Sequence, residues 1–243
     1  MNGLKRTLVV LSLVGFGFAA HAESVLSTAK PEEVGLSSAQ LEKIEEVTAK
    51  NIDEGLIPGA VMLVARHGKV AWVSVQGKRE PNGDAMKYDS IFRIYSMTKP
   101  MVTTALMQMV EEGRLQVSDP VAKFLPSMGA MKVGTDVVGA DGKPHLHLAD
   151  PTRPMTVQDL MRHTSGLVYG ARGTSLVYQE YMKAKIGDRT ATNEEFVARL
   201  SKTPLRFNPG DRWEYSVAVD VQGRLLEVLN GGRPLHEVLA ERI

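Results

Sequence analysis

A continuous apolar stretch in the first half of the sequence restricts the folds that this chain can adopt. After Gly59, the segment 60–65 reads Ala-Val-Met-Leu-Val-Ala, so apolar side chains fall on both faces of a strand. A turn signal at 67–68 leads into a second strand over 69–75, which predicts a hairpin. Because a strand that is apolar on both faces must be covered on both, we expect helices above and below this sheet.

Helical patterns lie on both sides of the hairpin. Segment 37–55 predicts an amphipathic helix that begins at a capping box over 37–40 and ends near Gly55. Beyond Gly113 the chain is predicted to be mostly helical, with short elements and many loops. The signals in that region are capping sequences at 156–159 and 192–195, a turn at 208–211 and an apolar-faced helix over 217–229.

The N-terminal segment 1–22 has the layout of a secretory signal peptide. Two cationic residues precede an apolar run over 8–18, and an Ala-His-Ala sequence ending at Ala22 provides a cleavage site. Cleavage before Glu23 would leave a single domain, 23–243, in the periplasm or outside the cell. The apolar run is too short to cross a bilayer and no other segment approaches spanning length, so we expect no stable membrane span.

Composition excludes several classes of function. The 243 residues include no cysteine, so disulfides, thiolate nucleophiles and cysteine metal ligands are absent. The formal net charge of +1, without a long basic or acidic block, argues against nucleic acid as a partner. His145 and His147 have metal-ligand spacing, but they lie in a polar segment, 129–154, expected to be a surface insertion without a third ligand. We expect neither a metal nor an organic cofactor.

Ser96 and Lys99 form an S-x-x-K pair at the start of a helical pattern that ends at Gly113. If Ser96 lies in the first helical turn, Lys99 lies one turn above it on the same face. A serine hydroxyl needs a base to become a nucleophile, and burial near a helix N-terminus disfavours the charged form of lysine. The alternative is an N-cap serine and a solvated lysine. A second S-x-x-K pair, Ser27 and Lys30, has no apolar helix after it.

Further motifs follow Ser96 in an order that resembles the serine β-lactamase-like superfamily. They are Leu-Met-Arg-His-Thr-Ser-Gly-Leu at 160–167 and Phe-Asn-Pro-Gly at 207–210, followed by Trp-Glu-Tyr-Ser at 213–216. Over roughly 31–242 the chain is similar to class C β-lactamase-related carboxylesterases, and more distantly to D-alanyl-D-alanine carboxypeptidases. The resemblance implies an α/β fold of the β-lactamase/transpeptidase type, an α+β sandwich in which an antiparallel sheet layer packs against a largely helical region.

The resemblance also implies roles for three residues. Ser96 would be the acylated nucleophile, Lys99 the group that orients and deprotonates it, and Tyr215 a second acid and base. Tyrosine suits that role if a nearby cation such as Lys99 lowers its pKa. On its own, however, Tyr215 beside Trp213 also fits an aromatic core pair.

Four polar or aromatic residues between these motifs have weaker signals. His163 is expected to be structural at a helix end, and Ser165 a turn residue. Tyr169 and Arg172 fit either a substrate cleft or an ordinary polar loop. The sequence therefore assigns no substrate-binding residue.

We expect a serine hydrolase that cleaves small carboxylic esters through an acyl-enzyme on Ser96. Lactamases and carboxypeptidases of the superfamily usually carry asparagine two residues after the tyrosine, whereas this chain has Val217. One alternative is a D-alanyl-D-alanine carboxypeptidase or β-lactamase acting on cell-wall peptides or β-lactams. Another is an inactive remnant or binding module. The physiological substrate and the oligomeric state are not defined by the sequence.

The third motif of the superfamily, K-T-G or an H-x-G variant, has no counterpart in this sequence. The segment 202–204, Lys-Thr-Pro, precedes Tyr215 and contains a proline, and nothing suitable follows before Ile243. That motif lies on a C-terminal strand and supplies an oxyanion donor, whose loss commonly costs on the order of 10²–10³ in rate. We therefore expect the C-terminal strands to be missing, and an N-terminal portion of a longer enzyme that is poorly folded and weakly active alone.

Overall fold

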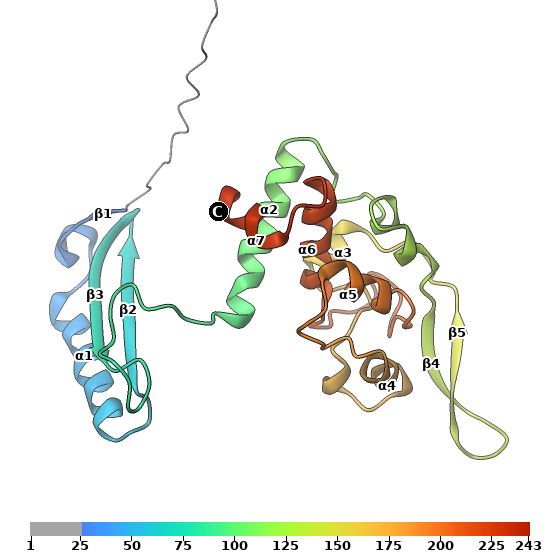
Figure 1. Ribbon diagram of the computed structural model, residues 1–243, viewed down its shortest axis with the longest axis horizontal. Helices are drawn as coiled ribbons and strands as arrows, with labels where there is room; N and C mark the ends of the chain where they lie inside the picture. The colour runs from blue at the N-terminus through green and yellow to red at the C-terminus, as the bar shows by residue number, and fades with distance from the viewer. Residues whose placement is uncertain (1–25) are drawn as a thin grey trace, which may run out of the picture. The chain divides into compact units, whose positions relative to one another are not determined.

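The computed structural model describes residues 26–243, so the predicted signal peptide over 1–22 lies outside the described residues. The chain divides into two compact units, with the boundary between Phe92 and Arg93 (Figure 1). The expectation of a single domain over 23–243 stays a prediction.

The first unit is a small sheet with a helix on one face. The strand order is β1-β3-β2, with β1 parallel and β2 antiparallel to β3. The residues of the connecting turn, His67 and Gly68, both have positive φ angles, 53° and 70°, as a tight hairpin turn requires. The predicted helix and hairpin are thus confirmed. The elements are β1 (Ser27–Thr28), α1 (Ser38–Asp53), β2 (Gly59–Arg66) and β3 (Lys69–Gly77).

Helix α1 covers one face of this sheet. The Thr48 hydroxyl donates a hydrogen bond to the Ile44 carbonyl and lies 3.4 Å from the Met62 sulfur, which joins the helix to β2. On the opposite face of the sheet, large apolar side chains remain exposed within residues 26–92. They are Leu63 (46% exposed), Val73 (38%) and Val75 (38%). The expected cover on both faces is therefore found on one face of this unit only.

The start of α1 differs from the predicted capping box. Ser37 occupies the N-cap position, but its side chain makes no capping hydrogen bond. Instead the Glu32 carboxylate accepts hydrogen bonds from the Ser38 amide at 2.8 Å and the Ser38 hydroxyl at 3.1 Å. A carboxylate from the preceding turn thus satisfies the first free amide of the helix, that of Ser38, while the Ser37 side chain caps none.

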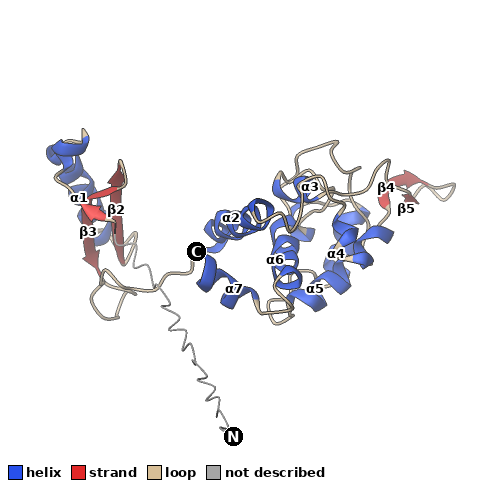
Figure 2. Ribbon diagram, turned by 90° about the horizontal axis from the view of Figure 1, so that it is seen from above, coloured by secondary structure: helices blue, strands red, loops and turns tan. Residues whose placement is uncertain are grey.

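The second unit is largely helical. Helix α6 lies between α2 and α5, and α7 packs beside α2 and α6 (Figure 2). The capping boxes expected at Thr156 and Thr192 both form, with Asp159 and Glu195 as their partners. The predicted helices after Ser96 and over 217–229 are confirmed. The helices are α2 (Thr98–Glu111), α3 (Val157–Met161), α4 (Leu176–Lys183), α5 (Asn193–Leu200), α6 (Ala218–Leu229) and α7 (Leu235–Arg242).

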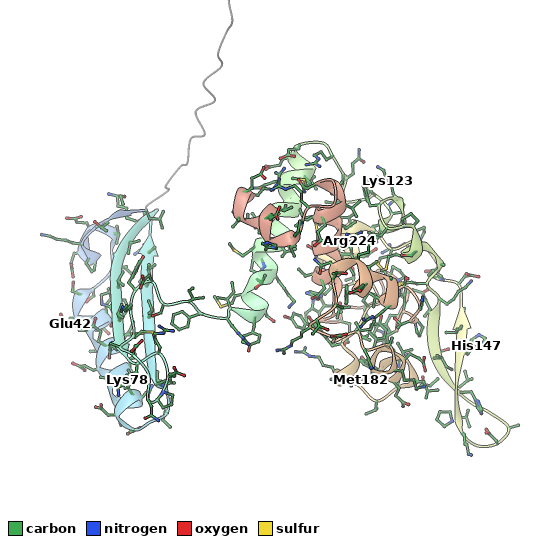
Figure 3. The ribbon with its side chains drawn as sticks, viewed as in Figure 1. Glu42, Lys78, Lys123, His147, Met182 and Arg224 are labelled. Atoms are coloured by element: carbon green, nitrogen blue, oxygen red, sulfur yellow. The ribbon has the colours of Figure 1, made fainter. Side chains whose placement is uncertain are left out.

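A two-stranded hairpin, β4 (Val133–Val138) and β5 (Pro144–Ala149), projects from this helical unit (Figure 3). It occupies most of the segment 129–154 expected to be a surface insertion. The alternation of polar and apolar residues over 145–148 is a strand signal that the prediction did not use. His145 and His147 both lie on β5, and the His145 ring forms a hydrogen bond of 2.8 Å with Asp141. Among residues 26–243, no three His, Asp or Glu side chains gather closely enough to hold a metal ion.

The core of the second unit packs around α6. Leu225 and Leu226 are fully buried and belong to one apolar cluster with buried residues of every other helix of this unit. Burying a leucine of this kind contributes about 1.5–3 kcal/mol. A polar bridge crosses the core, because the Thr103 hydroxyl on α2 donates a hydrogen bond at 2.8 Å to the side-chain amide oxygen, Oε1, of the buried Gln222 on α6. Within residues 26–243, every helix is too short or too polar to cross a membrane.

Candidate active site

Ser96 lies in a single 3₁₀ turn, Tyr95–Met97, immediately before α2. Its side chain is exposed, and the preceding residue, Tyr95, has a φ of +45°. A positive φ is costly for a bulky residue and is often found where a chain presents a functional side chain. The turn thus presents the Ser96 hydroxyl at the start of the helix rather than inside its first turn, as the sequence had suggested.

The three predicted site residues come together around the Ser96 hydroxyl oxygen. The Tyr215 phenol donates a hydrogen bond to this oxygen at 2.8 Å, and the Lys99 ammonium donates at 3.2 Å. The Lys99 nitrogen also lies 4.9 Å from the centre of the Tyr215 ring. Residues separated by more than a hundred positions in the sequence therefore form one cluster, which a simple N-cap serine or an aromatic core pair would not require.

A row of backbone hydrogen bonds holds the segment that carries Tyr215. The amides of Arg206, Gly210 and Glu214 donate to carbonyls of the turn after α3, at 2.7, 2.7 and 2.8 Å. The accepting carbonyls belong to Gly166, Thr164 and His163, in that order. These three bonds join the His-Thr-Ser-Gly motif to the segment 206–214, which contains the Phe-Asn-Pro-Gly motif and leads to Tyr215. We call this row of main-chain hydrogen bonds the seam.

Gly166 allows this close approach. Its φ is +82°, and a Cβ atom at this position would lie 2.2 Å from the Phe207 carbonyl oxygen. No L-amino acid with a side chain fits there without moving the backbone of the facing segment. Ser165 is fully buried beside it, which agrees with a structural turn residue.

His163 supports Tyr215 from the end of α3. Its Nδ1 accepts a hydrogen bond from the Ser216 amide at 3.2 Å, and its ring lies 4.8 Å from the Tyr215 ring. Burial, followed by the nearby charge of Lys99, lowers the pKa of His163. The lowered pKa favours the neutral ring, and because Nδ1 accepts from the Ser216 amide, that ring carries its proton on Nε2. This is the structural role expected from the sequence.

The pKa shifts of Lys99 and Tyr215 differ from the expectation that Lys99 loses its charge. Burial lowers the pKa of Lys99, but attraction to the phenol oxygens of Tyr215 and Tyr169 outweighs burial, so the pKa lies above its ordinary value. The hydrogen-bonding interaction with Lys99, and then that with Ser96, lowers the pKa of Tyr215. The arrangement favours a lysine that keeps its charge and a tyrosine that loses its proton readily.

A cleft of about 790 Å³ opens beside Ser96 and lies wholly within the second unit. Tyr169 and Val217 line it together with Ser96, and so does Met182 on α4, which is labelled in Figure 3. Asp220 also borders the cleft, and the surrounding protein raises the pKa of its carboxyl by desolvation, although part of the side chain keeps contact with solvent. Of these residues the sequence had suggested only Tyr169, because no motif marks the cleft walls.

The model of the Beta-lactamase family matches residues 44–243. This chain belongs to that family. Esterase EstB of Burkholderia gladioli is 34% identical over 206 residues, which cover 83% of this chain and 48% of EstB. Protein Rv1367c of Mycobacterium tuberculosis is 34% identical over 192 residues, covering 79% of this chain and 46% of the relative. The chain thus spans about half the length of the curated relatives it matches.

A solved structure agrees with this assignment. EstCE1, described as a hydrolase with promiscuous acyltransferase activity, shares 30% sequence identity with a TM-score of 0.69. The match covers 83% of this chain and 49% of EstCE1. The fold is therefore of the β-lactamase/transpeptidase type, with small sheets and helices, and the fold class expected from the sequence is confirmed.

Proposed function

We propose that this chain carries the nucleophile of a serine hydrolase that cleaves small carboxylic esters through an acyl-enzyme on Ser96. The observation that carries the proposal is the position of the Ser96 oxygen between the Tyr215 phenol and the Lys99 ammonium. That geometry supplies a nucleophile, a base within hydrogen-bond reach and a cation that favours the deprotonated base.

In the acylation step, Tyr215 acts as a phenolate and takes the proton from Ser96 as the serine oxygen attacks the ester carbonyl carbon. The charge of Lys99 stabilises the phenolate before this transfer and orients the serine oxygen. When the tetrahedral intermediate collapses, the bond to the alkoxy group breaks and Tyr215 gives its proton to the leaving alcohol. The products of this half-reaction are the free alcohol and an acyl ester on Ser96.

Deacylation uses the same groups in reverse. Tyr215 takes a proton from a water molecule, whose oxygen attacks the acyl carbon of the Ser96 ester. Collapse of the second tetrahedral intermediate breaks the bond to the serine oxygen, and Tyr215 returns the proton to Ser96. The carboxylic acid is released and the enzyme is regenerated. The amide of Ser96 is expected to donate to the oxyanion in both steps.

Two observations favour ester substrates over amides. Val217 stands where an amide-binding asparagine would lie in the lactamases and carboxypeptidases, and it borders the cleft beside Ser96. EstB is named an esterase and EstCE1 a hydrolase. We extend ester hydrolysis to this chain on these grounds, and we propose export to the periplasm from the predicted signal peptide.

Labelling with a fluorophosphonate tests the nucleophile. The chain is incubated with the probe and its intact mass is measured, beside Ser96→Ala and Ser27→Ala variants. We expect one adduct on the wild type and on Ser27→Ala, which alters the other S-x-x-K serine, and none on Ser96→Ala. An unlabelled wild-type chain that is soluble would contradict the proposal and favour an inactive or binding protein.

Substrate choice is tested with the same preparation. A p-nitrophenyl ester of a short acid should be turned over, and Tyr215→Phe should lower that rate by about 10²–10⁴-fold. Rapid acylation by penicillin without measurable ester turnover would instead support a lactamase or carboxypeptidase.

A further inference from the structure

Tyr215 has a second cation on its ring in addition to Lys99. The guanidinium carbon of Arg172 lies 4.8 Å from the centre of the Tyr215 ring and 5.5 Å from that of Tyr169. These distances fall within the range in which a guanidinium is attracted to an aromatic face. Within residues 26–243, Arg172 takes part in no ion pair that would explain its position otherwise.

The backbone around Arg172 is held against α4. The residue lies in a 3₁₀ turn, 170–172, in which its amide donates to the Tyr169 carbonyl at 3.0 Å. A Cβ atom on Gly170 would lie 3.0 Å from the Tyr181 Cβ, and one on Gly173 would lie 2.4 Å from the Tyr178 ring. Glycines on both sides thus let the turn pack tightly on the helix. The direction in which Arg172 leaves the backbone is therefore set by packing, although its side chain is exposed.

We propose that Arg172 is a positioning residue for the reaction, which stacks on the Tyr215 ring and supplies the second positive charge that the phenolate requires. The proposal rests on the proposed function of Tyr215 as the base. Arg172 adds its charge to that of Lys99, and the two cations lie 4.8 and 4.9 Å from the centre of the Tyr215 ring.

Several other charged or titratable groups surround Tyr215 and act on it together with Arg172. Lys99 and Arg172 both lower the pKa of Tyr215, with Lys99 the stronger of the two. The lowered pKa of His163 favours its neutral form, which contributes little charge. Asp220 faces Lys99 and Tyr169 and raises the pKa of Tyr169. The groups to be held constant in a test are those from each neighbouring element: Lys99 of α2, His163 after α3, Tyr169 of the loop before α4, and Asp220 of α6.

The test is the titration of the Tyr215 phenol, which needs no turnover. Tyrosinate absorbance in the near ultraviolet is followed against pH, and the signal of a Tyr215→Phe variant is subtracted to isolate this residue. Burial raises the pKa values of Tyr169, Tyr178 and Tyr181, so these tyrosines titrate later. We expect Arg172→Met to raise the midpoint of Tyr215 by about half a pH unit, because the exposed guanidinium attracts the phenolate more strongly than the neutral phenol. Arg172→Lys should recover most of that shift.

A matched control removes a cation from a different ring. Arg212 lies 4.9 Å from the centre of the Phe207 ring and is also exposed, so Arg212→Met removes one positive charge of similar geometry near the site. We expect this variant to leave the Tyr215 midpoint unchanged. An unchanged midpoint in Arg172→Met, or an equal shift in Arg212→Met, would overturn the proposal.

Measurements of ester turnover, made beside the fluorophosphonate labelling, separate this proposal from the function on which it rests. If the chain reacts with fluorophosphonate, Arg172→Met should shift the acid limb of the rate–pH profile to higher pH, together with the Tyr215 midpoint. KM for a neutral ester should stay unchanged. A rise in KM alone, with an unmoved midpoint, would assign Arg172 to substrate binding and refute a positioning role. A shifted midpoint in a chain that never forms an adduct would refute the hydrolase and leave the contact of Arg172 with Tyr215 standing.

Discussion

The two units bury their apolar residues to very different extents. In residues 26–92, four apolar side chains are buried, namely Val34, Leu41, Ala71 and Met86. The second unit instead has one continuous cluster drawn from helices far apart in the sequence. The difference follows from architecture, because a sheet with a helix on one face buries one side of each strand, whereas helices around α6 bury residues in several directions.

The site belongs to the unit with the larger core. Ser96, Lys99 and Tyr215 all lie in residues 93–243, and so do the residues that line the cleft beside them. Precise placement of a nucleophile needs rigid support, which a continuous core supplies. The comparison therefore predicts that changes of the same kind will have unequal effects in the two units.

The largest difference is expected for removal of a leucine side chain. Leu225→Ala leaves a cavity in the core of the second unit and should lower its free energy of unfolding by about 2–5 kcal/mol. Leu63→Ala, on the exposed face of β2, should change the stability of the first unit by less than about 1 kcal/mol. Hydrogen exchange measured for each unit during denaturation tests both values. Equal losses of unfolding free energy in the two variants would show that the two cores do not differ in the way their burial predicts.

A smaller difference is expected for carboxylates that accept hydrogen bonds. Asp159 is buried, which would raise its pKa, but hydrogen bonds from Arg153 and then Thr156 outweigh burial and lower it. Asp159→Asn should cost the second unit about 2–3 kcal/mol at neutral pH. Glu32 also has a lowered pKa, through its bonds from Ser38, but it is exposed, and Glu32→Gln should have little effect.

The pH dependence gives the sign of the Asp159 effect. Because its folded pKa lies below the unfolded value, its contribution to stability is complete above the ordinary range of an aspartate and disappears as the pH falls through the folded pKa. Acid titration of unfolding should therefore show a steep loss in the wild type and a flatter curve in Asp159→Asn. Parallel curves for the two proteins would contradict this role.

The smallest of the three effects on stability is expected at glycines with positive φ. Gly166→Ala should cost about 1–2 kcal/mol from backbone strain and displace the facing carbonyl, so that fluorophosphonate labelling of Ser96 also slows. Gly68→Ala, in the β2–β3 turn, has a similar φ of +70° but nothing within 4 Å of the added Cβ. It should cost the first unit a similar or smaller amount and leave labelling unchanged. Equal labelling rates in both variants would show that the seam beside Gly166 does not position Tyr215.

Local patterns were sufficient for most elements and for finding the three residues of the candidate site. The apolar run after Gly59, the capping signals at Thr156 and Thr192, and the order of motifs around Ser96 and Tyr215 each depend on short stretches of sequence. They predicted the hairpin, the helix starts and the three clustered residues.

The remaining features depend on contacts between distant segments. The open face of β2 could not be predicted, because nothing in that strand specifies what packs against it. The same is true of Arg172, whose contact with Tyr215 depends on the turn that packs against α4. The hairpin β4–β5 did have a local signal that the prediction did not use, the alternation of polar and apolar residues over 145–148. The direction of the pKa shift of Lys99 was also missed, since it is set by phenol oxygens supplied from residues 169 and 215 rather than by burial alone.

The seam between the turn after α3 and the segment 206–214 joins main chain to main chain. Three amides and three carbonyls form it, and none of those bonds uses a side chain of the segment that carries Tyr215. Substitutions at exposed positions such as Asp211 and Arg212 would therefore leave these bonds in place. The surface beside the candidate site can thus change in sequence while Gly166 and the main chain keep Tyr215 within hydrogen-bond distance of Ser96.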